Sequence, residues 1–249
     1  MLNVDNIYII HHTKLADRKT RLDASLRENN IRAEYIIEHD QEDLSDELIS
    51  GNYECDEDLY NSKILPIYKS KFSSFKELST AEISCTFKHR AAIEKIADAT
   101  LGPLIGGESY GLILEDDAIL CEDFSELFNE FLLRTPPYWD AIFIGCCSDL
   151  HVPHRRIAEG VVAYQMSHPA SKGGVAYLLK KSAAAKITST MKTFTAVSDV
   201  ELAYQIHRHD LKTYWWEPPL VEQGSECGLY SPSLRDATMP VICAIKKLD

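Results

Sequence analysis

The chain has 249 residues, of which 45% are hydrophobic and 26% are charged, with 11 Gly and 10 Pro. This composition is typical of a globular protein with its own core, and it excludes a disordered chain, a collagen-like repeat and a small disulfide scaffold. The 38 acidic residues outnumber the 26 Lys and Arg, so the formal net charge is −12. Such a charge repels nucleic acids and anionic membranes, and an anionic substrate would need a metal ion or helix N-termini in order to bind.

No stretch of the sequence has the length and apolar character of a transmembrane helix or a secretory signal. The first six residues include Asp5 and no basic residue, and the apolar run that follows them is short. The seven cysteines are an odd number without Cys-x-x-Cys spacing, which is typical of reduced thiols. The sequence therefore predicts a cytoplasmic protein with no nucleic-acid partner and no transmembrane segment, and it leaves the oligomeric state open.

The first predicted elements alternate between strand and helix. Residues Asn6–Ile10 form an apolar run rich in β-branched residues, which predicts a buried strand. A helix with apolar residues four positions apart is predicted over Lys19–Asn29, and a second strand over Ala33–Ile37. This β-α-β start predicts a mostly parallel central sheet with helices on both faces. Residues 38–76 begin with many acids and no Lys or Arg, so we expect them to form a solvated, irregular and partly mobile insertion.

The rest of the chain continues the pattern of an α/β protein. Ser79 and Glu82 form a predicted capping box for a helix over residues 79–98, and Ser198 and Glu201 form a second one. Glycines within 102–107 break the chain after the first of these helices. Further helices are predicted at 123–135 and 182–191, and further strands at 110–114, 139–145, 161–166, 175–179 and 213–217. No linker is evident, so we predict a single α/β domain over residues 1–249.

The most informative residues are the three carboxylates Glu115, Asp116 and Asp117. They follow the apolar segment Tyr110–Leu114, whose composition predicts a central, buried strand. Ligand sites of open α/β sheets lie beyond the carboxyl ends of such strands. Three like charges at a partly dehydrated edge are costly unless a cation neutralises them, and Mg²⁺ and Mn²⁺ prefer oxygen ligands. The turn therefore predicts a divalent-metal site that binds a diphosphate, and a solvated acidic turn or a helix N-cap is the simpler alternative.

Six blocks of sequence follow one another along nearly the whole chain, beginning at Ile7, Ala81, Leu112, Trp139, Ser171 and Ala196. They read IYIIHHTKLADRKTR, AEISCTFKHRAAIEKI, LILEDDAIL, WDAIFIG, SKGGVAYLLKKSAAAKI and AVSDVELAYQIHRHDLKTYWWEPPLVEQ. In this order they resemble glycosyltransferase family 25, which includes lipopolysaccharide-biosynthesis glycosyltransferases and procollagen galactosyltransferases. The third block corresponds to the family's acidic signature, and six blocks in order are more specific than that signature alone.

The resemblance implies a GT-A-type fold and a glycosyltransferase that inverts the configuration of the anomeric carbon. The expected donor is a nucleotide-diphosphate sugar, in particular a UDP-sugar carrying a hexose such as galactose or glucose. The expected acceptor is a hydroxyl group of a glycan or of a lipid-linked or protein acceptor. Glu115 and Asp117 would hold Mn²⁺ or Mg²⁺ in a Glu-x-Asp variant of the Asp-x-Asp arrangement of GT-A enzymes, and Asp116 would hydrogen-bond the ribose or the sugar.

Two acidic residues are candidates for the catalytic base. Asp199 is the better one, because it lies at the start of a predicted helix whose dipole favours the ionised carboxylate. Glu201 is the alternative, although its capping role explains it without catalysis. Trp215 and Trp216 lie in the last predicted strand, where we expect one ring to pack inward and the other to be available for stacking on an acceptor sugar.

Several other residues are expected to contact the donor. Arg18 follows the first strand and can pair bidentately with a phosphate. Gly173 and Gly174 would let the backbone approach the substrate closely. The resemblance adds His89, from the second block, as a donor contact. The remaining expected contacts are Ile10, His11 and His12 at the end of the first strand, and Gln223 in a loop after Pro218-Pro219.

Two other functions are compatible with the sequence. A metal-dependent phosphohydrolase or nucleotidyltransferase would use the same acidic turn, together with further carboxylates at strand ends, for which Asp140 and Asp149 are the candidates. A non-catalytic member of the family would bind a nucleotide or a glycan. The family usually has Asn-Leu in place of His11-His12 and Ser-His in place of Lys88-His89, and these differences keep that second alternative open.

Overall fold

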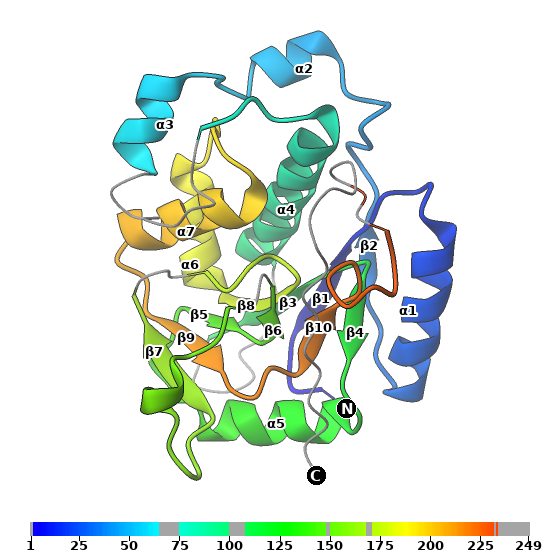
Figure 1. Cartoon of the computed structure of the whole chain (residues 1–249), viewed down its shortest axis with the longest axis vertical. Helices are drawn as coiled ribbons and strands as arrows, with labels where there is room; N and C mark the ends of the chain where they lie inside the picture. The colour runs from blue at the N-terminus through cyan, green and yellow to red at the C-terminus, as the bar shows by residue number, and fades with distance from the viewer. Residues whose placement is uncertain are drawn as a thin grey trace.

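A computed structural model describes residues 2–64, 75–99, 108–147, 150–167, 171–231 and 233 of the chain. A seven-stranded sheet forms its centre, in the order β2-β1-β3-β8-β5-β9-β7 (Figure 1). These strands are β1 (Asn6–Ile10), β2 (Glu34–Ile36), β3 (Tyr110–Glu115), β5 (Ala141–Phe143), β7 (Ala163–Met166), β8 (Ala176–Lys180) and β9 (Thr213–Trp216). All seven lie within or overlap the segments that the sequence predicts as strands.

Five of these strands run in the same direction. β1 is parallel to both β2 and β3, and β5 is parallel to β9. β8 lies between β3 and β5 and is antiparallel to both of them, so β3 and β5 share one direction. β7 is antiparallel to β9 at the edge. The expectation of a mostly parallel sheet is therefore confirmed, with β8 and β7 as the two reversed strands.

Helices cover both faces of the sheet, as expected. On one face, α1 (Ala16–Glu28) and α5 (Phe124–Arg134) pack on a core that contains Ile9 and Trp216. On the other face, α4 (Thr80–Asp98), α6 (Lys181–Thr190) and α7 (Ser198–Arg208) pack on a core that contains Ile10 and Trp215. Successive strand residues point to opposite faces, so neighbouring residues are both buried when both faces are covered. For this reason both tryptophan rings are buried, and the expectation that one of them faces an acceptor sugar is wrong.

The two predicted capping boxes have different outcomes. At α4 the Ser79 hydroxyl accepts from the Glu82 backbone N–H, and the Glu82 carboxylate accepts from the Ser79 backbone N–H, so both reciprocal bonds are present. At α7 the N-cap is Val197, which makes no side-chain cap bond, and Ser198 is already helical. The second capping box is therefore wrong, because the helix begins one residue earlier than the box requires.

A second, smaller sheet was not predicted. It contains β4 (Ala118–Leu120), β10 (Val221–Gln223) and β6 (Gly145–Cys146), in that order. Strands of two or three residues are too short to show a periodic pattern, so sequence reasoning placed Gln223 in a loop. Within the described residues there is also a short 3₁₀ helix, η1 (His154–Arg156), and no helix is both long and apolar enough to cross a membrane.

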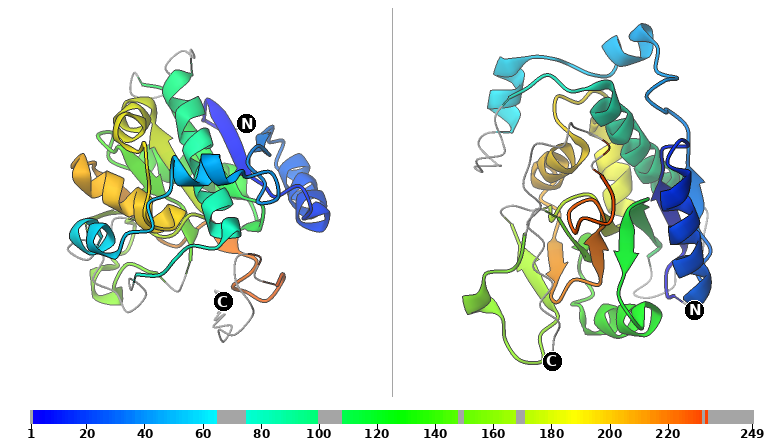
Figure 2. Two further views of the ribbon diagram at one scale, coloured as in Figure 1. Left: turned by 90° about the horizontal axis from the view of Figure 1, so that it is seen from above. Right: turned by 45° about the vertical axis from the view of Figure 1, so that its right-hand side comes forward.

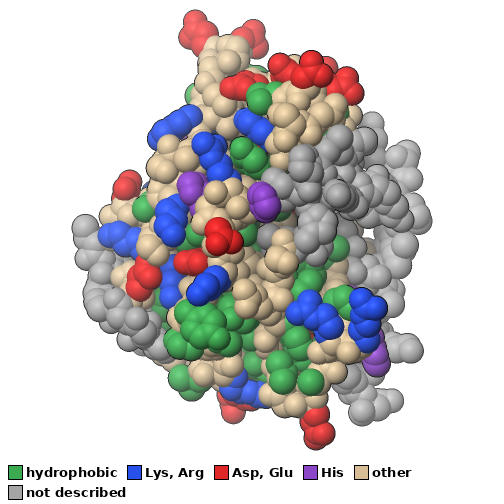
Figure 3. All heavy atoms as spheres, turned by 90° about the vertical axis from the view of Figure 1, so that its left-hand side faces the viewer, with side chains coloured by type: hydrophobic (Ala, Val, Ile, Leu, Met, Phe, Trp, Pro, Cys, Tyr) green, Lys and Arg blue, Asp and Glu red, His purple; other side chains and the backbone are tan. Residues whose placement is uncertain are grey.

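The described part of the acidic insertion is more ordered than expected. It forms α2 (Asp46–Ser50) and α3 (Glu57–Lys63), which lie at the opposite end of the molecule from α5 (Figures 1 and 2). Tyr60 and Ile64 are buried against residues of α7, so this segment packs on the core instead of being solvated throughout. Acidic side chains gather at this end of the molecule (Figure 3). Residues 65–74 and the predicted chain break at 102–107 lie outside the described residues.

Candidate active site

The acidic turn lies where the strand order reverses. From β1 the chain passes through α1, on one face, to β2, and it returns through α4, on the opposite face, to β3 on the other side of β1. Such a switch point opens a crevice beyond the carboxyl ends of the two strands. Glu115 is the last residue of β3 and pairs with Ile10, the last residue of β1. The three carboxylates therefore occupy the position that the sequence predicts for a ligand site.

Both carboxylate oxygens of Asp116 already have protein partners, one of which is the Arg18 guanidinium. Its Oδ1 accepts from Arg18 Nη1 at 3.0 Å, and its Oδ2 accepts from His11 Nδ1 at 2.8 Å. The backbone N–H of His12 also points at Oδ2, at 3.3 Å. Both Asp116 and Arg18 are buried. The sequence assigned Asp116 and Arg18 to the donor, and the structure pairs them with each other, which holds the segment after β1 against the turn.

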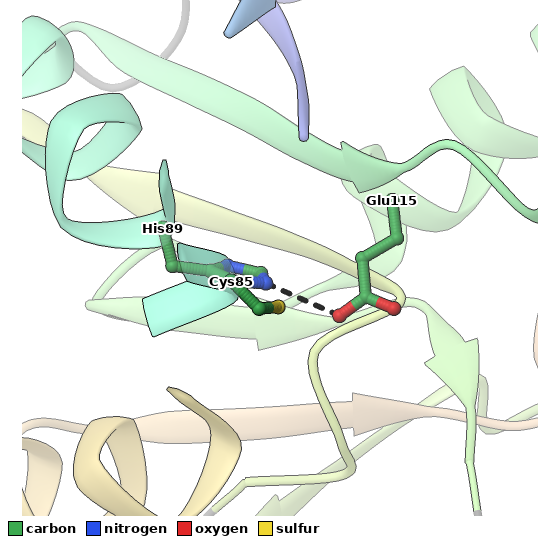
Figure 4. Close-up of side chains that lie close together, drawn as sticks. All are labelled: Cys85, His89 and Glu115. Atoms are coloured by element: carbon green, nitrogen blue, oxygen red, sulfur yellow. Dashed lines mark hydrogen bonds and ion pairs between the residues drawn. The ribbon is translucent and has the colours of Figure 1, made fainter. Parts of the chain in front are cut away.

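Glu115 faces two side chains from other elements. Its Oε1 lies 3.1 Å from Nε2 of His89 on α4 (Figure 4). Its Oε2 accepts from Nε2 of Gln223 on β10 at 3.3 Å. Gly174 permits this arrangement, because a Cβ at that position would lie 2.6 Å from Glu115 Oε1 and 3.3 Å from the His89 ring. The glycine thus leaves room for the Glu115 carboxylate beside His89. The sequence predicted a different role, in which the glycine lets the backbone approach the substrate closely.

Among the three carboxylates of the turn, Asp117 has a buried oxygen without a hydrogen-bond partner in the described residues, as does Glu201 on α7. It is 2% exposed, and its Oδ2 accepts from the backbone N–H of Ser225 at 3.2 Å. Its Oδ1 is buried and has no hydrogen-bond partner among the described residues. Burial and the nearby Glu115 carboxylate raise the pKa of Asp117 to about 6. A buried carboxylate oxygen without a partner is costly unless a cation completes the site.

Asp199 lies in the first turn of α7 and belongs to the same electrostatic group. Burial, followed by the Glu115 carboxylate, raises the pKa of Asp199, and His89 partly offsets this shift. The helix dipole was expected to favour the ionised form, and its effect here is smaller than that of burial, so the expected direction is wrong. A raised pKa makes a carboxylate a better proton acceptor near neutral pH.

Glu201 does not join this group. It lies two positions after Asp199 on α7, and side chains with that spacing leave a helix in different directions. Its carboxylate is buried and accepts from Gln205 Nε2 at 2.9 Å, and burial raises its pKa. The structure therefore does not bring the alternative base to the acidic turn.

The other predicted contacts are spread around the turn. Gly173 has a φ of +93°, and a Cβ there would lie 2.3 Å from the Cβ of Cys147. Glycine is therefore needed at this position for its backbone conformation and for the close packing of Cys147. His12 Nε2 is 3.0 Å from a Glu42 carboxylate oxygen. Ile10 is buried at the end of β1.

A cavity of about 80 Å³ lies beside the turn. The residues that line it include His12, Arg18, Cys85, Lys88, Glu115 and Asp116. Pockets that hold a whole small ligand usually measure about 300–1,000 Å³. The cavity therefore has room for an ion and a few waters, and a complete nucleotide sugar would extend beyond these lining residues.

Sequence reasoning missed three residues of this region. Lys88 is buried and forms an ion pair with Asp40, 2.8 Å from its Oδ1, which ties the acidic insertion to α4. Tyr177 on β8 places its hydroxyl 3.0 Å from His89 Nδ1. Asp40 is one of many acids in its segment, and nothing in the sequence distinguishes it from its neighbours. Tyr177 lies in a strand of apolar residues, where an aromatic residue normally indicates packing.

The carboxylates required by the phosphohydrolase alternative are not brought to the turn. Asp140 precedes β5, so it lies at the amino end of a strand that runs in the same direction as β3. Its carboxylate accepts from the backbone N–H of Lys212 at 2.8 Å. Asp149 lies outside the described residues.

The fold and the carboxylate group at its switch point define an α/β protein of the kind that binds ligands beyond the carboxyl ends of its strands. A comparison with protein families identifies the particular one. The family model of glycosyltransferase family 25 (LPS biosynthesis protein) matches residues 4–202. The chain therefore belongs to glycosyltransferase family 25 and is a glycosyltransferase, as the six sequence blocks indicated. A comparison with curated proteins found no match.

Proposed function

We propose that this chain is a metal-dependent, inverting glycosyltransferase that moves a hexose from a nucleotide-diphosphate sugar to an acceptor hydroxyl. The observation that carries the proposal is the buried Oδ1 of Asp117, which has no partner among the described residues and lies in the electrostatic reach of Glu115. Arg18 pairs with Asp116 at 3.0 Å and lies 3.8 Å from Asp117 Oδ2, so one guanidinium faces two aspartates and the turn, with Glu115 included, keeps an excess of negative charge.

These two carboxylates suit a hard divalent cation, which prefers oxygen ligands and keeps positions open for phosphate oxygens. Glu115 and Asp117 would hold Mn²⁺ or Mg²⁺, which supplies Lewis-acid stabilisation of the departing diphosphate when it is bound. The diphosphate of the donor would contact Arg18 and Lys88, which line the neighbouring cavity and are also paired with Asp116 and Asp40.

Asp199 is the proposed base. The acceptor oxygen attacks the anomeric carbon while its proton passes to the Asp199 carboxylate, the new glycosidic bond forms, and the bond from carbon to the diphosphate oxygen breaks with its electron pair. Attack on the face opposite the leaving group inverts the anomeric carbon. The raised pKa of Asp199 supports this role.

The donor and acceptor are proposed from the family. A UDP-sugar carrying galactose or glucose is the proposed donor, and a glycan or a lipid-linked or protein hydroxyl is the proposed acceptor, in keeping with the family's description as an LPS biosynthesis protein. Ile10, His11, His12, Arg18, His89, Gly173, Gly174 and Gln223 remain proposed donor contacts, directly or by placing the acidic turn.

The experiment is a thermal-shift and turnover measurement with UDP-, GDP- and CMP-sugars, each with and without Mn²⁺. We expect one sugar nucleotide to stabilise the protein only when Mn²⁺ is present, and Asp117→Asn to lose this response and to lower turnover at least about 10²-fold. Glu222→Gln is the matched control, because its side chain leaves β10 on the face opposite Gln223. Unchanged turnover in folded Asp117→Asn would remove the proposed metal site.

A further inference from the structure

Three potential metal ligands of different chemical type meet beside the acidic turn. Cys85 and His89 lie one helical turn apart on the same face of α4, and Glu115 ends β3. One donor atom from each residue, namely the Cys85 Sγ, a ring nitrogen of His89 and a carboxylate oxygen of Glu115, lies within 4.8 Å of the other two. The side chains point toward one another (Figure 4). The thiol of Cys85 has no part in the proposed sugar transfer.

We propose that Cys85, His89 and Glu115 bind a thiophilic divalent cation of the Zn²⁺ type, at a site distinct from the hard-metal site of Glu115 and Asp117. Thiolate, imidazole and carboxylate are the three ligand classes of protein zinc sites. Tetrahedral bonds of about 2.0–2.3 Å place the ligand atoms roughly 3.3–3.7 Å apart. The distance of 3.1 Å between His89 Nε2 and Glu115 Oε1 is close to this spacing, so small side-chain movements would complete the site.

The neighbours of the ligands support coordination. A metal-binding histidine usually donates its other ring N–H to a fixed partner. His89 Nδ1 lies 3.0 Å from the Tyr177 hydroxyl, and the two rings are stacked. The hydroxyl can donate to Nδ1 in the metal-free protein or accept from it when Nε2 binds a metal. The Cys85 Sγ lies 3.8 Å from the Ser198 hydroxyl, a weak contact that orients the sulfur.

The site is open to ligands from one side. Cys85 and Glu115 both line the cavity beside the turn, so water can reach the group. Three protein ligands and one open position are the arrangement of a catalytic or exchangeable zinc site, whereas structural sites use four protein ligands. We therefore expect reversible binding of the cation.

Glu115 is shared between the two sites. Its Oε1 faces His89, and its Oε2 faces Gln223. If the proposed hard-metal site is correct, Zn²⁺ at Cys85 and His89 draws the Glu115 carboxylate away from Asp117 and opposes donor binding with Mn²⁺. This consequence rests on the proposed function, and the binding of the thiophilic cation does not.

The test is a titration of the full-length, reduced protein with Co²⁺, followed by absorption spectroscopy. A cobalt ion bound to a thiolate gives an intense ligand-to-metal charge-transfer band in the near ultraviolet, which oxygen and nitrogen ligands do not give. We expect this band to saturate at one equivalent of Co²⁺ and to disappear when Zn²⁺ displaces the cobalt. Cys85→Ser should abolish the band, and His89→Gln should weaken cobalt binding at least tenfold.

Two controls separate this site from other metal-binding groups. Cys121→Ser should keep the band, because Cys121 lies just beyond β4 and outside the cluster. His12→Gln should also keep it, because the second candidate group found within the described residues, His12 with Asp40 and Glu42, contains no sulfur. Circular dichroism shows whether each variant is folded.

The proposal is overturned if wild-type protein gives no charge-transfer band, or if the band persists in folded Cys85→Ser. It is also overturned if Cys146→Ser, instead of Cys85→Ser, abolishes the band. A wild-type protein that binds cobalt through Cys85 but shows no Mn²⁺-dependent stabilisation by any sugar nucleotide would contradict the proposed function alone. The two failures are therefore distinguishable.

Discussion

The three adjacent carboxylates of the acidic turn have different environments. Asp116 is held by Arg18 and His11, Glu115 is shared between His89 and Gln223, and Asp117 keeps one buried oxygen without a partner among the described residues. Because these three carboxylates are neighbours in the sequence, the sequence alone does not distinguish their environments. Their environments divide them into a structural anchor and two candidate metal ligands.

The assignment of the base is tested by comparing two carboxylates of α7. Asp199→Asn should lower turnover about 10²–10⁴-fold, because no carboxylate is left there to take the proton of the acceptor hydroxyl. Donor binding with Mn²⁺ should remain. Turnover of the wild-type enzyme should fall as the pH drops through the raised pKa of Asp199, above the ordinary value of about 3.9, because the base becomes protonated. Glu201→Gln is the matched control, and equal losses in both folded variants would contradict the assignment.

A pH dependence of stability is expected at His151, outside the acidic turn. Hydrogen bonds to Cys146 and Glu217 raise the pKa of His151 to about 10. Protonation of this ring stabilises the fold fully below the unfolded pKa of about 6.5, and the contribution is lost as the pH rises through about 10. The ring is 45% exposed, so we expect a contribution of only about 1 kcal/mol after screening.

The measurement is the difference in melting temperature between wild type and His151→Gln as a function of pH. It should be largest near pH 6 and shrink toward pH 10. His154→Gln, on the exposed η1 turn, serves as the control. A difference that grows with pH would contradict the sign of the expected effect.

At the level of elements, the approach of β8 to the end of β3 makes the site possible. Gly174 precedes β8, and its lack of a side chain lets Glu115 and His89 meet. We expect Gly174→Ala to destabilise the protein by about 1–3 kcal/mol through overpacking and to reduce turnover strongly, because the new methyl group displaces the Glu115 carboxylate.

Gly160→Ala is the control that distinguishes a loss of turnover caused by displacement of Glu115 from one caused by lower stability alone. Gly160 has a φ of +75°, and no atom lies within 4 Å of the position that a Cβ would take, so the substitution strains the backbone by roughly 1–2 kcal/mol without a clash. Chemical denaturation should therefore show a lower free energy of unfolding in both variants. Enzyme kinetics should show a lower turnover only in Gly174→Ala. Normal turnover in Gly174→Ala would mean that Glu115 can move without consequence.

At the level of the whole molecule, the acidic insertion joins the fold through α3. Tyr60 is 5% exposed and packs with Ala196, Val200 and Ala203, next to the helix that carries Asp199. Tyr60→Ala should cost about 3 kcal/mol of stability through the cavity it leaves, with faster proteolysis within residues 38–64. Tyr138→Ala is the control, because that ring is 58% exposed and should cost little. Equal protease resistance in wild type and Tyr60→Ala would contradict the docking of α3.

The strands of the central sheet, the long helices and the position of the acidic turn were predictable from the sequence. Buried strands of the central sheet are apolar runs, and the amphipathic helices carry periodic apolar residues, so both are local patterns. The family was also predictable, because six blocks keep their order along the chain. The short strands of the second sheet and the two helices of the insertion were not predictable, because two to seven residues carry too little periodicity.

Which charges neutralise one another was decided only by the tertiary structure. Arg18 and Asp116 are far apart in the sequence, as are Lys88 and Asp40, and the pairs meet because α1 brings Arg18 to the turn after β3 and α4 brings Lys88 to the segment after β2. Asp199 on α7 is half-buried, and desolvation together with the Glu115 carboxylate raises its pKa, against the direction expected from the helix dipole. Local sequence determines which residues form a strand or a helix, whereas long-range pairing and burial determine the charge that each side chain carries.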